Sequence, residues 1–126
     1  RGVERGRAFR TNGRPGRGYL GVGNNGMLHT VNKSPFERSS FATCLRYARA
    51  GDSVLLFEDG VYAARAGSPD AEELKTATKD RTFYALGPDL EARGITPDQL
   101  IAGVKIVDYG GFVDLAAGEG PVQAWL

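Results

Sequence analysis

The apolar residues of this chain fall into short runs that alternate with helix-like stretches, and this alternation most constrains the fold. The run SVLLFE at 53–58 is nearly continuously apolar, as expected for a central strand covered on both faces. Four further strands are predicted at 27–31, 81–86, 104–108 and, as a short fifth strand, 122–126. Strands that alternate with helices favour parallel pairing through right-handed crossovers. The sequence therefore predicts an α/β fold with one doubly wound, mostly parallel sheet of four to five strands flanked by helices.

The helix between the first two strands has the clearest pattern. Residues 39–51 read SSFATCLRYARAG and place apolar side chains at 41, 44, 45 and 48, the spacing of an amphipathic helix that Gly51 would end. Ser34, Pro35 and Glu37 form an S-P-x-E start signal, so a start one turn earlier is also open. Further helical segments are predicted at 60–67, 68–80, 97–103 and 110–120, of which 68–80 is either a polar helix or a loop.

The charge of the chain is divided unevenly. Residues 1–26 hold six arginines, one glutamate and eight glycines, a net charge of +5, whereas residues 27–126 carry −4. The first segment shows no apolar period, so burial would offset little of the entropy lost on ordering it, and we expect it to be disordered. Its Phe9 and Tyr19 among arginines also fit a nucleic-acid-binding arm. Because strand-like sequence begins at Met27, the only methionine, we expect a non-native leader at 1–26 and one domain at 27–126.

Composition excludes several classes of site. One cysteine, Cys44, cannot form an intramolecular disulfide, and with the single His29 it cannot complete a four-ligand zinc site without carboxylates or a second chain. The longest apolar run, SVLLF at 53–57, is far shorter than the roughly 20 residues of a membrane span. The string GVGNNG at 21–26 precedes the first strand and so does not predict a dinucleotide site. We expect no metal, cofactor or membrane, and the cytoplasm is the simplest location.

Polar residues near the strand ends have two interpretations each. Glu58 and Asp59 follow the apolar strand, where a carboxylate pair could bind a cation or act in acid–base chemistry, but capping of the next helix by Asp59 is favoured. The same holds for Asp108 and Tyr109 after the fourth strand. His29, inside the first strand, is expected to be a structural or interface histidine rather than a catalytic one.

Cys44 lies on the apolar stripe of its predicted helix. Cysteine is among the most buried residue types, which favours an inert core thiol. A reactive role instead requires a thiolate that a helix N-terminus or a nearby cation promotes. The candidate cations close in sequence are Lys33, Arg38, Arg46 and Arg49. Pattern alone leaves both roles open.

Several motifs together resemble the DsrH/TusB family, the third subunit of the DsrEFH and TusBCD sulfur-relay complexes. They are LHTVNKSPF at 28–36, followed by YALGPDLEARG, VDYGGFVDL and the final VQAWL, so the resemblance spans Met27 to Leu126. It implies a small α/β subunit of an α2β2γ2 hexamer with DsrE-like and DsrF-like (TusD-like and TusC-like) partners. In such complexes sulfane sulfur passes as cysteine persulfide between upstream and downstream sulfur-carrier proteins.

The resemblance also gives Cys44 a role. DsrH-like members carry a cysteine in this helix, which favours the DsrH branch and a function in dissimilatory sulfur oxidation. Cys44 is accordingly the predicted catalytic residue, as the carrier of a persulfide. Two alternatives are kept: a TusB-like subunit for 2-thiouridine formation at the tRNA wobble position, and a non-catalytic scaffold subunit. Direct nucleic-acid binding is not expected.

Overall fold

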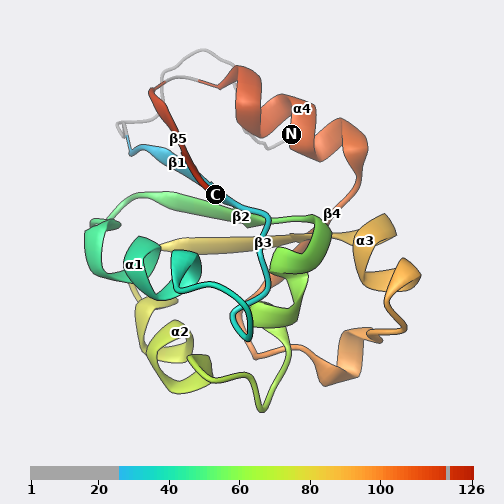
Figure 1. Ribbon diagram of the computed structural model, residues 1–126. Coiled ribbons are helices and arrows are strands. Elements are labelled where there is room, and N and C mark those ends of the chain that lie inside the picture. The colour runs from blue at the N-terminus through green and yellow to red at the C-terminus, as the bar shows by residue number, and fades with distance from the viewer. Residues whose placement is uncertain (1–25, 119) are drawn as a thin grey trace.

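Five parallel strands form one sheet with the order β4-β3-β2-β1-β5 in the computed structural model, which describes residues 26–118 and 120–126 (Figure 1). The strands are β1 (Leu28–Val31), β2 (Ser53–Leu56), β3 (Thr82–Leu86), β4 (Lys105–Val107) and β5 (Val122–Trp125). The predicted α/β fold is thus confirmed, and the short fifth strand is present. The leader predicted at 1–26 and the GVGNNG string lie almost entirely outside the described residues.

Helices cover both faces of the sheet. They are α1 (Ser40–Tyr47), η2 (Glu58–Ala64), α2 (Ala71–Ala77), α3 (Gly87–Ala92), η3 (Pro97–Gln99) and α4 (Tyr109–Ala117). Figure 1 shows α1 and α2 below the sheet and α4 above it. The strands β1 to β4 follow one another toward one edge of the sheet, and β5 then lies beside β1 at the opposite edge. Because crossovers are right-handed, reversing the direction moves the connecting helix to the opposite face.

The main core lies between the sheet and the helices α1, α2 and η2. Val31, Leu56 and Ala85 occupy one row across β1, β2 and β3, and all three side chains are buried. Phe83 of the neighbouring row meets Phe41 of α1 edge to face, with ring centroids 6.5 Å apart. Both phenylalanines have no exposed surface. This face of the sheet therefore carries most of the hydrophobic burial.

The opposite side of the molecule is much more open. The helix α4 contains no buried residue, although its sequence YGGFVDLAA is largely apolar. Phe112 contacts Phe57 beyond the end of β2, with ring centroids 5.6 Å apart. Tyr109 and Val113 remain 59% and 63% exposed. α4 is thus attached to the body by few side chains.

Several expected helix boundaries change. The early start at Ser34 is wrong: its carbonyl accepts only the Glu37 and Arg38 N–H groups in an isolated turn, and its hydroxyl accepts from Phe36 rather than capping a helix. The helix begins at Ser40 and ends at Tyr47, before the expected stop at Gly51. The segment 68–80 is helical over Ala71–Ala77, which decides between its two interpretations.

The helix α3 was missed by the sequence patterns. It begins at Gly87, directly after β3 ends at Leu86, so no loop separates the two elements. With six residues it is too short to show a helical period, and a single side chain, Leu90, is buried. The segments 60–67 and 97–103 form 3-10 turns rather than α-helix.

Candidate functional site around Cys44

Cys44, the predicted catalytic residue, lies inside α1 and faces the sheet. Its side chain is fully buried in the same core cluster as Phe41. Ala48 is also buried and Leu45 packs against the cluster, so the apolar stripe read from the sequence is confirmed. The thiol therefore has no contact with solvent in this conformation.

The surroundings of Cys44 keep its thiol protonated. Burial raises the pKa of Cys44 to about 12, the negative charge of Asp52 adds to this, and the positive charge of Arg81 partly opposes it. At pH 7 a thiol with such a pKa is almost entirely protonated. Because the thiolate is the attacking form, this conformation holds Cys44 in an unreactive state.

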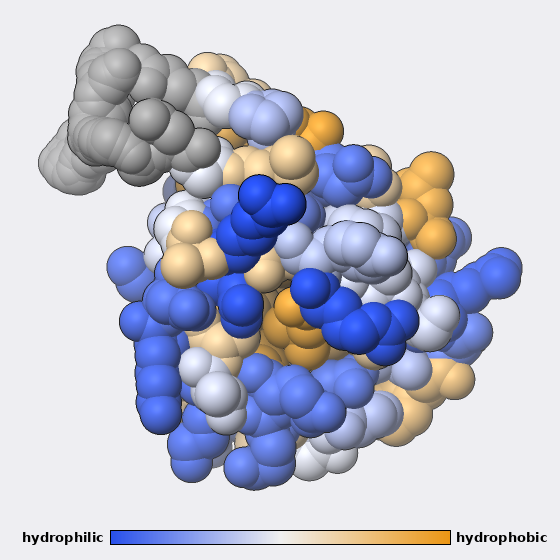
Figure 2. Space-filling view, turned by 90° about the vertical axis from the view of Figure 1, so that its left-hand side faces the viewer, coloured by the Kyte–Doolittle hydropathy of each residue, from blue (hydrophilic) through white to orange (hydrophobic). Residues whose placement is uncertain are grey.

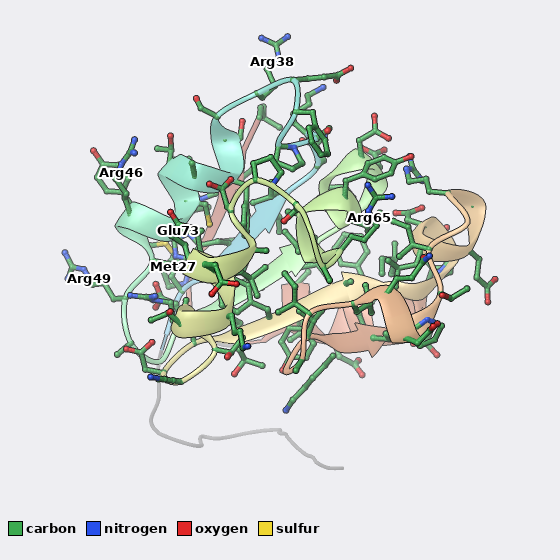
Figure 3. All side chains as sticks on the ribbon, turned by 90° about the horizontal axis from the view of Figure 1, so that it is seen from below. Met27, Arg38, Arg46, Arg49, Arg65 and Glu73 are labelled. Carbon is green, nitrogen blue, oxygen red and sulfur yellow. The ribbon has the colours of Figure 1, made fainter. Side chains whose placement is uncertain are left out.

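The cations that the sequence suggested do not act on the thiol. Figure 3 shows Arg38, Arg46 and Arg49 pointing away from the body of the protein. The cation that does act is Arg81, which precedes β3 and is brought near α1 because Thr82 pairs with Ser53. No local sequence pattern links position 81 to the helix at 40–47, so only the assembled sheet reveals this neighbour.

His29 is held by hydrogen bonds at both ring nitrogens. Its Nε2 lies 2.8 Å from Asp52 Oδ2, and the indole Nε1 of Trp125 donates to its Nδ1 at 3.0 Å. Since an indole N–H can only donate, Nδ1 must accept, and the ring proton sits on Nε2 and is donated to Asp52. The side chain is only 3% exposed. Both ring nitrogens are thus held within this chain, as expected for a structural histidine.

Asp52 is the centre of this network. Besides His29, its carboxylate accepts the backbone N–H groups of Met27 and Arg49, both at 2.9 Å. Burial alone would raise the pKa of Asp52, but the hydrogen bonds from Arg49, His29 and Met27 lower it below its usual value. One ionised carboxylate thus links the start of β1 to the residues that follow α1. Through the ring of His29, which accepts from Trp125, it is also linked to β5. Neither Asp52 nor Trp125 stood out in sequence as a partner of His29.

The carboxyl ends of β2 and β3 carry a second polar cluster. Glu58 has a left-handed backbone (φ 50°), and its N–H donates to Asp89 Oδ2 at 2.6 Å. The predicted helix cap by Asp59 is wrong, because η2 begins one residue earlier and Asp59 instead accepts from Arg93, at 2.9 Å from both Nε and a terminal nitrogen. The cluster is a set of ion pairs and hydrogen bonds within the protein.

The remaining predicted cap is confirmed. Asp108 Oδ1 accepts the Gly111 N–H at 2.8 Å and caps α4.

Within residues 26–118 and 120–126, no group of three or more His, Cys, Asp or Glu side chains could hold a metal ion. Among the helices of the same residues, none has the length and apolar character needed to cross a membrane.

The family of the chain is decided by sequence comparison. Residues 33–121 match the sequence profile of the family described as DsrH-like protein. The chain belongs to the DsrH-like family. Within this family, the chain is 42% identical to the protein TusB of Erwinia tasmaniensis and 40% identical to the protein TusB of Escherichia coli K12. Each alignment runs over 99 residues, 79% of this chain and 100% of the relative.

Solved structures support the fold. The ychN protein of Escherichia coli superposes with a TM-score of 0.71 and 18% identity, over 80% of this chain and 99% of that chain. The protein MTH1491 of Methanobacterium thermoautotrophicum, whose function is unknown, gives a TM-score of 0.63 and 19% identity over the same shares. At these identities the likeness concerns the fold alone.

The comparisons bear on the choice between the DsrH branch, which the sequence favoured, and the TusB-like alternative. The matches to the DsrH-like family and to TusB proteins confirm the family that the sequence motifs resembled. The expectation of the DsrH branch, and with it sulfur oxidation, rested on Cys44 and receives no support from these relatives. They favour the alternative, a TusB-like subunit.

Proposed function

We propose that this chain is the TusB-like subunit of a cytoplasmic sulfur-relay complex that supplies sulfur for 2-thiouridine at the tRNA wobble position. The observation that carries this proposal is the match along the full length of TusB proteins at about 40% identity. The many exposed apolar side chains of the chain suit a subunit that is covered in a complex; they include Phe36, Tyr47, Tyr109, Val113 and Leu126. We further propose the α2β2γ2 hexamer with TusC-like and TusD-like subunits.

Within this complex the chain acts as a scaffold and not as a sulfur carrier. A carrier thiol must ionise, attack the outer sulfur of a donor persulfide and then present that sulfur to an acceptor. Cys44 has no exposed surface and a pKa of about 12. An added sulfur atom would also have to fit into a packed core, which typically costs about 1–3 kcal/mol. The persulfide role predicted for Cys44 is therefore the weaker of the two proposals.

The pathway is tested by deleting the gene in its own organism. We expect wobble 2-thiouridine to fall sharply when tRNA nucleosides are quantified by mass spectrometry, and to return when the gene is restored. Unchanged 2-thiouridine together with a loss of stored-sulfur oxidation would instead support the DsrH branch.

The hexamer is tested by native mass spectrometry of the three co-expressed subunits. A chain that remains monomeric under these conditions would contradict the assembly.

The scaffold role is tested with Cys44→Ala and with Cys44→Ser, which keeps the number of side-chain heavy atoms. Complexes that contain either variant should deliver sulfur to tRNA within about twofold of the wild type, because no step passes through this thiol. In the folded wild type, iodoacetamide should fail to modify Cys44 near pH 8, as burial blocks ionisation and access. A tenfold loss of sulfur delivery in an intact complex, or a persulfide on Cys44 detected as about 32 Da of added mass, would restore the carrier role.

A further inference from the structure

The chain ends in a strap that few side chains attach to the rest of the protein. The C-terminal strap comprises residues 121–126 and contains β5, the strand at one edge of the sheet. Three of the four β5 side chains are exposed, and Trp125 alone is partly buried and packs against the core cluster. Besides its backbone pairing with β1, the strap is attached by Trp125 and by an exposed hydrogen bond from Ser40 Oγ to the Leu126 carbonyl at 3.0 Å. The attachment of the strap therefore depends largely on Trp125.

The one polar atom of the Trp125 side chain is bonded to His29. The indole N–H donates to His29 Nδ1 at 3.0 Å, and the two ring planes are 23° apart. On α1, the exposed ring of Tyr47 stacks against the indole, with centroids 5.8 Å apart. The bond to His29 exists only while Nδ1 has no proton, because a protonated nitrogen cannot accept. The strap is thus attached to the neutral form of the single histidine.

A proton on Nδ1 would strengthen one hydrogen bond of His29 and break the other. The Nε2 atom lies 2.8 Å from Asp52 Oδ2, and an ionised carboxylate stabilises a charged imidazolium. Asp52 is in turn fixed by the backbone N–H groups of Met27 and Arg49, so the ring stays bonded to Asp52. The indole N–H of Trp125 would then face a second N–H group, and neither group can accept. Protonation therefore retains the contact with Asp52 and opposes the contact with the strap.

Asp52 is the charged group that faces this ring. The register partners of His29 are Val54 on β2 and Gln123 on β5, and both are uncharged. The Cys44 thiol of α1 lies within the influence of Asp52 but stays protonated, because burial raises its pKa to about 12. Burial also acts to raise the pKa of Asp52, but its hydrogen bonds lower it overall, so the carboxylate is ionised at neutral pH. Among the described residues, Asp52 is the one charged side chain bonded to the ring.

The cations of the neighbouring elements are directed elsewhere. Arg81, before β3, acts on the thiol of Cys44, and Figure 3 shows Arg46 and Arg49 pointing away from the body of the protein. Asp52 lies where β2 begins, at the side of the molecule that faces the viewer in Figure 2, and hydrophilic side chains cover most of that side. Its side chain is 10% exposed. The network is therefore close to water that can supply a proton.

We propose that the C-terminal strap is a pH-sensitive element that is closed while His29 is neutral and opens when its Nδ1 takes up a proton. Histidine is the side chain whose charge ordinarily changes between about pH 5 and pH 8, so opening falls within the range of cellular pH. The open strap has bound one proton more than the closed strap, so a fall in pH favours opening. Opening frees the backbone groups of β1 that pair with β5, and the ring of Tyr47 that Trp125 covers. The inference concerns this chain alone and does not rest on the proposed function.

The proposal is tested first on the unmodified chain, which holds one histidine and one tryptophan. Between pH 8 and pH 5, the single indole N–H signal in NMR spectra should shift with the same midpoint as the protonation of His29, and the fluorescence of Trp125 should move to the red. An indole signal that stays unchanged while His29 is protonated would overturn the proposal. A ring that remains neutral down to pH 5 would overturn it as well, as would global unfolding with the same midpoint in far-UV circular dichroism.

Hydrogen exchange measures the opening itself. After correction for the intrinsic pH dependence of exchange, the equilibrium constant for opening of the β5 amides should rise by up to tenfold for each unit of falling pH, as one linked proton requires. The amides of β2, at the centre of the sheet, are the internal control and should show no such rise. An equal rise at β2 and β5 would contradict a local opening of the strap.

Two substitutions separate the proton of His29 from other causes. His29→Gln keeps an acceptor for Trp125 but does not titrate, so exchange of the β5 amides should become independent of pH between pH 8 and pH 5. Asp52→Asn removes the charge that favours the imidazolium, so opening should move to lower pH. The matched control Gln123→Asn, on the exposed part of β5, should keep the wild-type midpoint. A pH dependence that persists in His29→Gln would overturn the proposal, and the measurements on the unmodified chain decide it if this variant does not fold.

Discussion

The two faces of the sheet differ in how completely the chain covers them. Beneath α1 and α2, Phe41 and Phe83 are fully buried, and the nearby carboxylate of Asp52 accepts three hydrogen bonds. On the other face α4 has no buried residue and exposes Tyr109 and Val113. We infer that the side chains packed beneath α1 and α2 contribute more to the stability of the isolated chain than α4 does.

The difference in stability between the two faces is tested most strongly by truncating one aromatic ring on each side. Phe83→Ala should reduce the free energy of unfolding by about 3–5 kcal/mol, because it removes a fully buried ring. Phe112→Ala on α4 should cost less than half as much, since its ring is only partly buried. Urea unfolding of both variants gives the two values. Equal losses would show that α4 is as important to the fold as α1.

A second prediction compares a buried carboxylate with an exposed one. Asp52→Asn should destabilise the protein by about 2–3 kcal/mol at neutral pH, because an amide cannot accept the three hydrogen bonds of the carboxylate. The control Asp114→Asn on exposed α4 should change stability by less than about 0.5 kcal/mol.

The pH dependence of that contrast has a defined sign. The pKa of Asp52 is lowered on folding, so its stabilisation is present above the unfolded value of about 3.9 and is lost as the pH falls through the folded value. The gap between wild type and Asp52→Asn should therefore close in acid. A gap that stays constant from pH 7 to pH 3 would contradict the network.

Cys44 provides an alkaline counterpart. Its pKa rises from the model-compound value of 9.0 to about 12 on folding, so the unfolded chain ionises first. The stability that this thiol contributes is present below pH 9 and is lost as the pH rises toward 12, at up to about 1.4 kcal/mol per pH unit. Thermal unfolding of wild type and Cys44→Ala between pH 8 and pH 10 should show the steeper decline in the wild type. Parallel curves would mean that the thiol is hydrated.

The smallest effect is expected on the exposed helix. Val113→Ser should alter the free energy of unfolding of the isolated chain by less than about 0.5 kcal/mol, since the side chain is 63% exposed. Differential scanning calorimetry is sufficient to detect a larger change. A loss above about 1.5 kcal/mol would show that Val113 is covered in solution.

The sequence predicted the strands well because period and apolar runs are local properties. The first four residues of SVLLFE became β2, and the stripe around Cys44 became the buried face of α1. The Asp52 network and the influence of Arg81 could not be predicted, because they join residues that are distant in sequence and depend on strand order. The predicted cap at Asp59 failed because a tertiary hydrogen bond from Arg93 occupies its carboxylate. The predicted start at Ser34 failed because its hydroxyl accepts the nearby Phe36 N–H within an isolated turn.

The pairing of β5 with β1 also sets the order of events during protein synthesis. The bond from Trp125 to His29 joins residues 96 positions apart, so β1 leaves the ribosome long before its second neighbour exists. Until then one edge of β1 presents unpaired backbone groups to other nascent chains, and His29 lacks half of its hydrogen bonds. Folding of this chain can therefore be completed only after β5 has emerged, and a translational pause before residue 122 would prolong the aggregation-prone state.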